Sequence, residues 1–347
     1  VDDQNRVIPH QAVRSVSVTA RWRLSFMSDL PALGYRTYRL ISSGEPATPE
    51  TIQGSDTVLE NDLIRLEFDP VTGCIASLRD KQQNIEVCAG QAAQPVVIND
   101  LSDTWGHNVI KFDDVIGVFT GKSVNLVEHG AVKSVIRVIS VYQQSTLTQD
   151  FTLYPGKRQI DVSVTVDWHE HAKLLKLRFP VNVTQPKVTH DIPYGHFEQT
   201  PNGDEVPFQS WIDVSGQVGA ATYGFSLLND GKYSVDCNGS DIGLTVLRSP
   251  VYAHHIPAVI DPEGQYAYMD QGIQRFNYAL LPHAGSWTTA GTVKRAAELN
   301  QRPVIMFATF HPDGRLPQSD SFIDVQPDNI VVSVLKQSED NDDLIIR

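Results

Sequence analysis

The tripeptide Trp105-Gly106-His107 is the segment whose residue types best suit a ligand site. It lies inside the string INDLSDTWGHN, which also contains Asp103. Sugars have apolar ring faces, which stack on indole, and hydroxyl groups, which bind fixed polar side chains. The segment therefore favours a carbohydrate-binding loop. A capping loop with a half-buried tryptophan would use the same residue types, and that alternative stays open.

A second string, LLNDGKY, offers Asn229 and Lys232 for similar polar contacts with a sugar. A type I′ or related hairpin turn at Asn229 to Gly231 would explain most of this string without any ligand. Asn229 and Lys232 are therefore candidate substrate contacts with a structural alternative.

Histidines occur close together in two places that are worth considering as metal sites. In DWHEH, a strand would put His169 and His171 on one face, but the helical spacing of a zinc-binding HExxH is absent. We therefore expect solvated polar groups at the end of a strand. His254 and His255 are adjacent, so their rings would diverge on a strand, and we expect no metal shared between them.

Signatures of covalent and nucleotide chemistry are missing from the sequence. It contains no GxSxG nucleophile elbow, no P-loop and no GxGxxG. The paired carboxylates of a glycosidase stay possible, because the fold sets their separation of about 5 to 10 Å. The 41 acidic residues contain no pair that stands out by spacing.

Composition narrows the class of protein. The formal net charge of −13 argues against a nucleic-acid partner, which would need basic patches. No apolar run is long enough to span a bilayer, so we expect no membrane partner. The three cysteines, Cys74, Cys88 and Cys237, are too few and too scattered for a disulfide framework or a zinc knuckle. They fit a reducing compartment, so we expect a cytoplasmic location.

Alternation of apolar and polar residues with a period of two dominates the chain, as is typical of strands with one buried face. It runs from Val16 to Phe26 and recurs at Ile160 to Trp168, Leu175 to Phe179 and Ile330 to Val334. Turn-forming residues separate these runs, which indicates antiparallel sheets packed as sandwiches. Only Thr292 to Leu299 has a helical composition. We therefore predict an all-β fold.

Three parts are expected along the 347 residues, because one core seldom serves such a length. The polar stretch from Ser42 to Asp56 is typical of a linker. We predict part of a small β-sandwich domain at 1–48, a large β-sandwich at 49–285 and a C-terminal β-sandwich segment at 286–347. The sequence begins without Met or a signal-peptide pattern, and we expect a fragment of a longer protein.

Seven strings, taken in order, resemble the C-terminal β-region of glycoside hydrolase family 38, the class II α-mannosidases. Each string alone would be weak evidence, but seven in register are specific. The strings are DLPALGYRTYRL, LENDLIRLEFDPVTGCIASLRDK, DWHEHAKLLKLRFPV, HDIPYGHFEQTPNGDEVPFQSWIDVS, YGFSLLNDGKYSVD, LTVLRSP and FNYALLPHAGSW.

The resemblance implies a large supersandwich of the galactose-mutarotase type, flanked by smaller β-sandwich segments. It also implies that the complete protein is a retaining α-mannosidase with a catalytic zinc ion. In the family, the zinc ligands and the aspartate nucleophile belong to regions N-terminal to this one. This chain would then have no catalytic residue and no metal ligand of its own, and its own N-terminal catalytic domain would be its partner. Family loops of the β-region reach the rim of the active site, so Asp103, Trp105 and His107 are expected next to the α-mannoside substrate.

Two alternatives from other classes remain. A free-standing carbohydrate-binding module would bind sugar without turnover. A mutarotase-like sugar epimerase would need a histidine and a carboxylate that converge on one concave face, which the scattered histidines do not indicate. A homodimer is a further expectation for a multidomain enzyme of this size.

Overall fold

The computed structural model describes residues 1–347 with the exception of 3, 15–21, 42–51, 310, 312 and 328. The chain forms two compact units. The smaller unit combines Val1–Thr48 with Pro303–Arg347, and the larger unit is Pro49–Arg302. Each unit is described by itself below.

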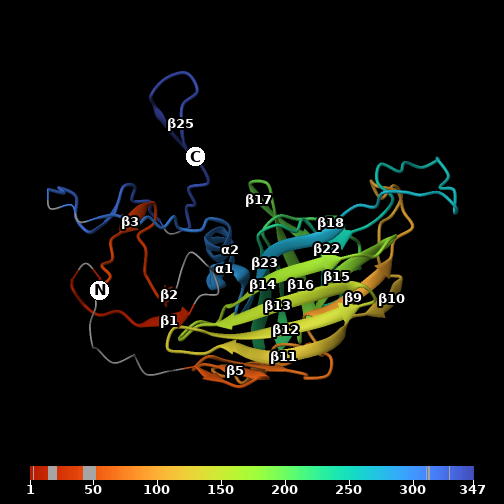
Figure 1. The fold of residues 1–347 in the computed structure, drawn as a ribbon, viewed down its shortest axis with the longest axis horizontal. Helices are drawn as coiled ribbons and strands as arrows, with labels where there is room; N and C mark the ends of the chain where they lie inside the picture. The colour runs from red at the N-terminus through yellow and green to blue at the C-terminus, as the bar shows by residue number, and fades with distance from the viewer. Residues whose placement is uncertain (3, 15–21, 42–51, 310, 312, 328) are drawn as a thin grey trace. The chain divides into compact units, whose positions relative to one another are not determined.

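A nine-stranded antiparallel sheet is the largest element of the larger unit (Figure 1). Its strand order is β11-β12-β13-β14-β23-β20-β19-β16-β17. The strand β23 thus lies between β14 and β20 although it comes last in the chain. The nine strands are β11 (Thr120–Glu128), β12 (Ser134–Tyr142), β13 (Ser145–Leu153), β14 (Ile160–Trp168), β16 (Thr184–Ile192), β17 (Gly195–Gln199), β19 (Trp211–Val218), β20 (Ala221–Asn229) and β23 (Gly272–Ala284).

Two further antiparallel sheets complete the larger unit, with the orders β10-β9-β15-β22-β21-β18 and β4-β5-β6-β7-β8. The six-stranded sheet consists of β9 (Gln94–Asn99), β10 (Val115–Val118), β15 (Lys173–Pro180), β18 (Val206–Pro207), β21 (Ser234–Asn238) and β22 (Asp241–Arg248). The five-stranded sheet consists of β4 (Gln53–Gly54), β5 (Val58–Glu60), β6 (Ile64–Phe68), β7 (Ile75–Asp80) and β8 (Ile85–Glu86).

All three sheets of the larger unit contribute to one hydrophobic core. Phe151 from the nine-stranded sheet packs on Phe68 from the five-stranded sheet, with ring centroids 4.8 Å apart. Phe179 from the six-stranded sheet lies 5.7 Å from Tyr278 of β23. Apolar burial is the main driving force for such packing. The all-β prediction with a large supersandwich is therefore confirmed.

Strand β14 shows why the period-two pattern was informative. Its residues alternate between buried and partly exposed, with Ile160, Val162, Val164, Val166 and Trp168 all buried. β-branched side chains fit such a half-buried surface well. The strand therefore forms where the sequence predicts it.

The two helices lie in the larger unit. Helix α1 (Trp287–Ala290) leads through Gly291 to α2 (Thr292–Asn300), which matches the predicted helix. Ala296 of α2 packs with Trp211 and Leu228 of the nine-stranded sheet. Among the residues that the structure describes, no helix has the length and apolar character needed to cross a membrane.

The smaller unit contains three two-stranded pairings. These are β1 (His10–Arg14) with β2 (Trp22–Phe26), β3 (Gly34–Arg36) with β24 (Ser319–Ser321), and β25 (Leu335–Gln337) with β26 (Leu344–Ile346). The β3–β24 pairing joins the start and the end of the chain, so the predicted parts 1–48 and 286–347 share a unit from 303 onward. Residues 286–302, with both helices, belong to the larger unit.

Sequence pattern predicts burial less well in the smaller unit. Of the predicted strand from Val16 to Phe26, residues 16–21 lie outside the described residues, and Trp22 is 64 % exposed. The strand predicted at Ile330 to Val334 is wrong, because those residues have no strand pairing. Alternation specifies a strand only where a second sheet covers its apolar face. Most of the predicted linker, 42–51, also lies outside the described residues.

A buried charged network, formed by Lys176, Arg178, Glu205 and Asp236, lies at the six-stranded sheet. Lys176 is fully buried and donates hydrogen bonds to both Glu205 and Asp236. Arg178 Nη1 donates to Asp236 Oδ1 at 2.9 Å. Buried charges persist only when they are paired and hydrogen-bonded, and these four satisfy one another.

Candidate functional site

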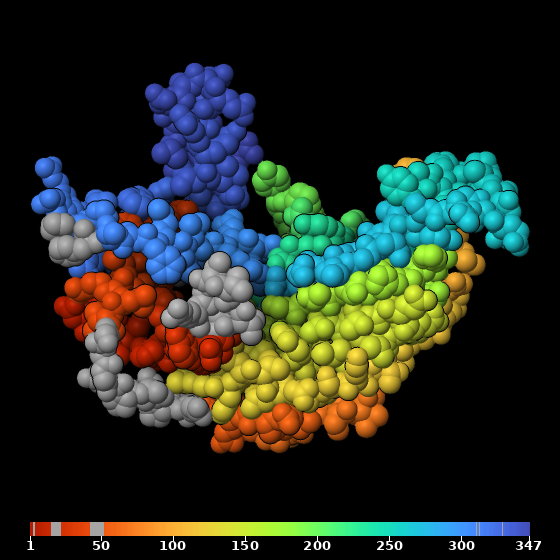
Figure 2. Space-filling view, viewed as in Figure 1, coloured from red at the N-terminus to blue at the C-terminus, as the bar shows by residue number. Residues whose placement is uncertain are grey.

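Two loops from distant parts of the chain meet at one end of the larger unit (Figures 1 and 2). Residues 100–114 connect β9 to β10, and residues 249–271 connect β22 to β23. The Thr104 backbone N–H donates to the His254 carbonyl at 3.0 Å, and the Thr104 hydroxyl donates to the Val251 carbonyl at 3.0 Å. In Figure 2 the second loop, in cyan, stands out from the yellow strands.

Arg248, the last residue of β22, holds the 100–114 loop. Its Nε donates to Asp100 Oδ2 at 2.8 Å, and its Nη2 donates to Ser102 Oγ at 2.6 Å and to the Asp103 carbonyl at 3.2 Å. The guanidinium also lies 4.8 Å from the centroid of the Phe112 ring. A planar fork with five donors can bind several acceptors at once, so one residue sets the path of the loop.

Asp103 is the anchor of the loop. Its side chain is fully buried, and its Oδ1 accepts a 3.0 Å hydrogen bond from the His107 backbone N–H. Its Oδ2 lies 2.6 Å from His107 Nδ1 and accepts a 3.2 Å bond from the Ile256 backbone N–H. Burial would raise the pKa of Asp103, but these hydrogen bonds together hold it below its ordinary value of 3.8. Asp103 is therefore ionised at neutral pH, and His107 Nδ1 carries the proton of their shared bond.

The glycine between Trp105 and His107 has a conformational role. Gly106 has a φ of +65°, in the left-handed region that residues with a Cβ rarely adopt, and its N–H donates to the Asp103 carbonyl at 3.0 Å. This turn brings His107 back over Asp103. The glycine of the Trp-Gly-His tripeptide is thus required by the loop geometry.

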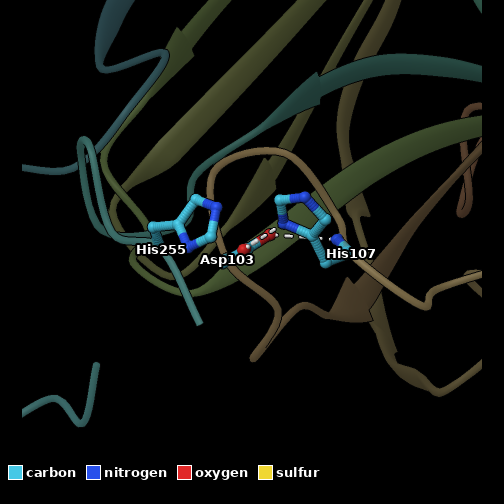
Figure 3. A group of neighbouring side chains, drawn as sticks. All are labelled: Asp103, His107 and His255. Atoms are coloured by element: carbon cyan, nitrogen blue, oxygen red, sulfur yellow. Dashed lines mark hydrogen bonds and ion pairs between the residues drawn. The ribbon is translucent and has the colours of Figure 1, made fainter. Parts of the chain in front are cut away.

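Four residues, which we call the loop cluster, surround the Asp103 carboxylate: Asp103, Trp105, His107 and His255. Figure 3 shows the carboxylate between the two imidazole rings, whose centroids are 4.7 Å apart. The Trp105 ring lies 5.3 Å from that of His255, and its side chain is 61 % exposed. An exposed indole beside fixed polar groups suits contact with a sugar ring.

The loop cluster has the composition of a binding site more than of a hydrolytic centre. Retaining glycosidases use two carboxyl groups about 5–5.5 Å apart, one of which attacks the sugar. Here the carboxylate of Asp100 is occupied by Arg248, and that of Asp103 by His107 and Ile256. Neither carboxylate has the free, exposed oxygen that an attacking group needs.

The structure thus brings together three of the five residues that the sequence singles out, Asp103, Trp105 and His107. Asn229 and Lys232 belong to the hairpin between β20 and β21. Asn229 is buried, and its Oδ1 accepts bonds from the N–H groups of Gly231 and Lys232 at 2.9 and 2.6 Å. Lys232 Nζ lies 4.8 Å from the Phe276 ring centroid, and burial lowers the pKa of Lys232 against the opposing charges of Asp270 and Asp230. These contacts fit the hairpin turn that was the structural alternative.

His255 is the member of the loop cluster that the sequence did not indicate. It was considered only beside His254, and His254 instead makes a 2.8 Å hydrogen bond through Nε2 to the Ala258 carbonyl. No spacing signal joins His255 to His107, because they belong to loops of different strands.

The DWHEH string forms no metal-ligand group. His169 Nε2 lies 2.9 Å from Asp167 Oδ1, whereas His171 stacks on Tyr268 with ring centroids 3.8 Å apart. Glu170 is buried and accepts a 2.9 Å bond from the Ser145 hydroxyl, so it is not solvated as expected. Its role is to hold a neighbouring strand end.

Comparisons with known proteins agree with this architecture. The family model described as "Glycosyl hydrolases family 38 C-terminal domain" matches residues 59–258. A crystal structure of a glycosyl hydrolase family 38 protein from Enterococcus faecalis superposes with a TM-score of 0.79 at 14 % identity, and covers 100 % of this chain and 46 % of that chain. That likeness shows a shared fold.

Curated relatives carry the name α-mannosidase. Alpha-mannosidase 2C1 from Mus musculus is 28 % identical over 89 % of this chain, and Alpha-mannosidase G from Dictyostelium discoideum is 23 % identical over its whole length. The chain spans about a third of the length of these relatives, 30 % and 33 % respectively. Since the family model covers more than half of its residues, the chain belongs to glycosyl hydrolase family 38 as a C-terminal domain of that family.

Proposed function

We propose that the complete protein is a retaining α-mannosidase that hydrolyses terminal α-linked mannose, and that this chain is a non-catalytic part of it. The observation that carries the proposal is the match to proteins named α-mannosidases over 89 % of the chain or more. The engaged carboxylates of the loop cluster support the second half of the proposal. The catalytic groups would then belong to an N-terminal domain outside this chain.

Zinc is part of this proposal, with its catalytic ligands outside the chain. When bound, zinc supplies a Lewis acid that orients the sugar. The described residues of this chain do not fit that ion, because their one candidate ligand set lacks a free carboxylate beside it to act as nucleophile. We therefore derive no catalytic step from the residues of this chain.

The loop cluster would form part of the wall of the sugar site. Trp105 offers an exposed ring face, and Arg248 holds the loop that carries it. Stacking on a fixed indole orders the sugar without contributing to bond cleavage. In this proposal, Asp103 positions the loop, and Trp105 and His107 contact the substrate.

Hydrolysis of an aryl α-mannoside tests the proposal. The assay compares this chain with the product of the whole reading frame, each with and without a chelator. We expect turnover only from the longer protein, and loss of turnover with chelator. Turnover by this chain alone would contradict the proposed division of roles, and resistance to chelator would contradict the zinc.

The two alternative functions are separated by the same proteins. A free-standing carbohydrate-binding module would bind mannosides without hydrolysis even as the longer product. The epimerase alternative gains one observation, because Asp103 and His107 do converge. Polarimetry of freshly dissolved aldoses with this chain would detect epimerase activity, which the mannosidase proposal does not predict.

The remaining expectations stay predictions. A homodimer would be detected by light scattering of the purified protein. A cytoplasmic location is compatible with three free, buried cysteines, since burial raises the pKa of each thiol.

A further inference from the structure

We propose that Asp103, His107 and His255 bind a divalent transition-metal ion of the zinc class. One carboxylate oxygen of Asp103 and one ring nitrogen of each histidine lie within 4.8 Å of one another. Within the described part of the chain, no other three His, Cys, Asp or Glu residues come together in this way. The site would be additional to the catalytic zinc and does not depend on the proposed function.

The donor set selects the class of ion. Two imidazoles and one carboxylate suit zinc and its neighbours in the first transition row, whereas calcium and magnesium prefer oxygen ligands alone. Three protein ligands leave a fourth position for water or for a hydroxyl group of a ligand. Zinc, cobalt and nickel are therefore the ions to test.

The geometry requires only small movements. Tetrahedral zinc with bonds of about 2.0–2.1 Å separates its ligand atoms by about 3.4 Å, so the widest pair must approach by somewhat more than 1 Å. Both imidazoles are exposed and can rotate, whereas Asp103 is buried and fixed by the Ile256 N–H and the His107 backbone N–H. The fixed ligand is thus the charged one.

Binding would replace a proton by the metal. His107 Nδ1 and Asp103 Oδ2 now share one proton across 2.6 Å. If His107 binds through Nδ1, the ion takes the place of that proton, which is released to solvent. Metal affinity should therefore fall as the pH is lowered, because protons compete for the same ligand atoms.

Titration of this 347-residue chain with Co²⁺ and Zn²⁺ is the direct test, because the proposed catalytic ligands lie outside it. We expect one equivalent of ion by calorimetry and, for Co²⁺, a visible absorption band that Zn²⁺ abolishes. Trp105 lies 5.3 and 6.3 Å from the two histidine rings, so its fluorescence should be quenched by Co²⁺. Trp105→Phe should remove that quenching and leave the calorimetric binding in place.

Two exposed-ligand variants decide the assignment. His107→Gln and His255→Gln should each weaken Co²⁺ binding at least tenfold, with an unchanged circular dichroism spectrum. The matched controls are His254→Gln, which removes the adjacent ring, and His169→Gln, which removes an exposed ring elsewhere. Controls should bind as the parent chain does.

The proposal is overturned by any of three results. These are no stoichiometric binding, binding that survives both His107→Gln and His255→Gln, or an equal loss in the two controls. Failure of the mannosidase assay would leave this titration untouched, because the titration uses no substrate.

Discussion

The buried charged network and the loop cluster contain similar groups, but they differ in how many of their polar atoms are already used. In the network, Glu205 accepts bonds from Lys176, Ser234 and Thr245, and Asp236 is bound by both Lys176 and Arg178. In the loop cluster only Asp103 is saturated, and the rings and the indole face solvent. Saturation under burial indicates a structural role, whereas open donor atoms on a fixed anchor indicate a binding role.

The largest effect should come from breaking the network. Lys176→Ala leaves Asp236 and Glu205 buried without their shared cation, and we expect the free energy of unfolding to fall by about 3–5 kcal/mol. Chemical denaturation of the chain measures this. Lys187→Ala, on an exposed position of β16, is the control and should change little. A small effect of Lys176→Ala would mean that the two clusters do not differ as argued.

A smaller effect on stability, with a larger one on binding, is expected at the clamp of the loop cluster. Arg248→Lys keeps the positive charge but loses the fork that binds Asp100, Ser102 and the Asp103 carbonyl together. We expect about 1–2 kcal/mol of lost stability and about tenfold weaker Co²⁺ binding. Arg137→Lys, at an exposed pair with Asp150, is the matched control. Unchanged Co²⁺ affinity would show that Arg248 does not position the site.

The anchor should also give a pH signature. Because the pKa of Asp103 is below 3.8 in the folded chain, its stabilisation is present above that pH and is lost as the pH falls toward the folded value. Asp103→Asn lacks this dependence. The difference in melting temperature between parent and variant should be largest near neutral pH and should shrink below pH 3.8. A difference that stays constant from pH 7 to pH 3 would contradict an ionised anchor.

The smallest effect concerns the exposed face of the loop cluster. Trp105→Ala in the complete enzyme should lower kcat/KM for an aryl α-mannoside by about three- to tenfold, as expected for one lost aromatic contact. Trp22 has a similar exposure and lies in the other unit, so Trp22→Ala is the control. Equal kinetics in both variants would remove Trp105 from the sugar site.

Much of the fold was predictable because its signals are local. The strand at Ile160 to Trp168 and the helix at Thr292 to Asn300 follow from periodicity and composition. The strand expected at Ile330 to Val334 failed, because alternation without a covering sheet does not specify pairing. Local pattern thus predicts elements well only where the core of the larger unit confirms the pattern.

The candidate site was predictable only in part, for a related reason. Asp103, Trp105 and His107 lie within five residues, so their types could be considered together. His255 and Arg248 reach them only because β9, β15 and β22 are neighbours in one sheet. Asn229 suits a turn and a ligand equally well by residue type, and only its bonds to Gly231 and Lys232 distinguish the two roles.

The late position of β23 has a consequence for how the chain is made. Until Gly272–Ala284 leaves the ribosome, β14 and β20 each have one unpaired edge, and the strands on either side of β23 are two separate half-sheets. Unpaired edges invite pairing with other chains. A premature stop anywhere before Gly272 should therefore yield insoluble protein, whereas a stop after Arg302 retains every strand of the nine-stranded sheet.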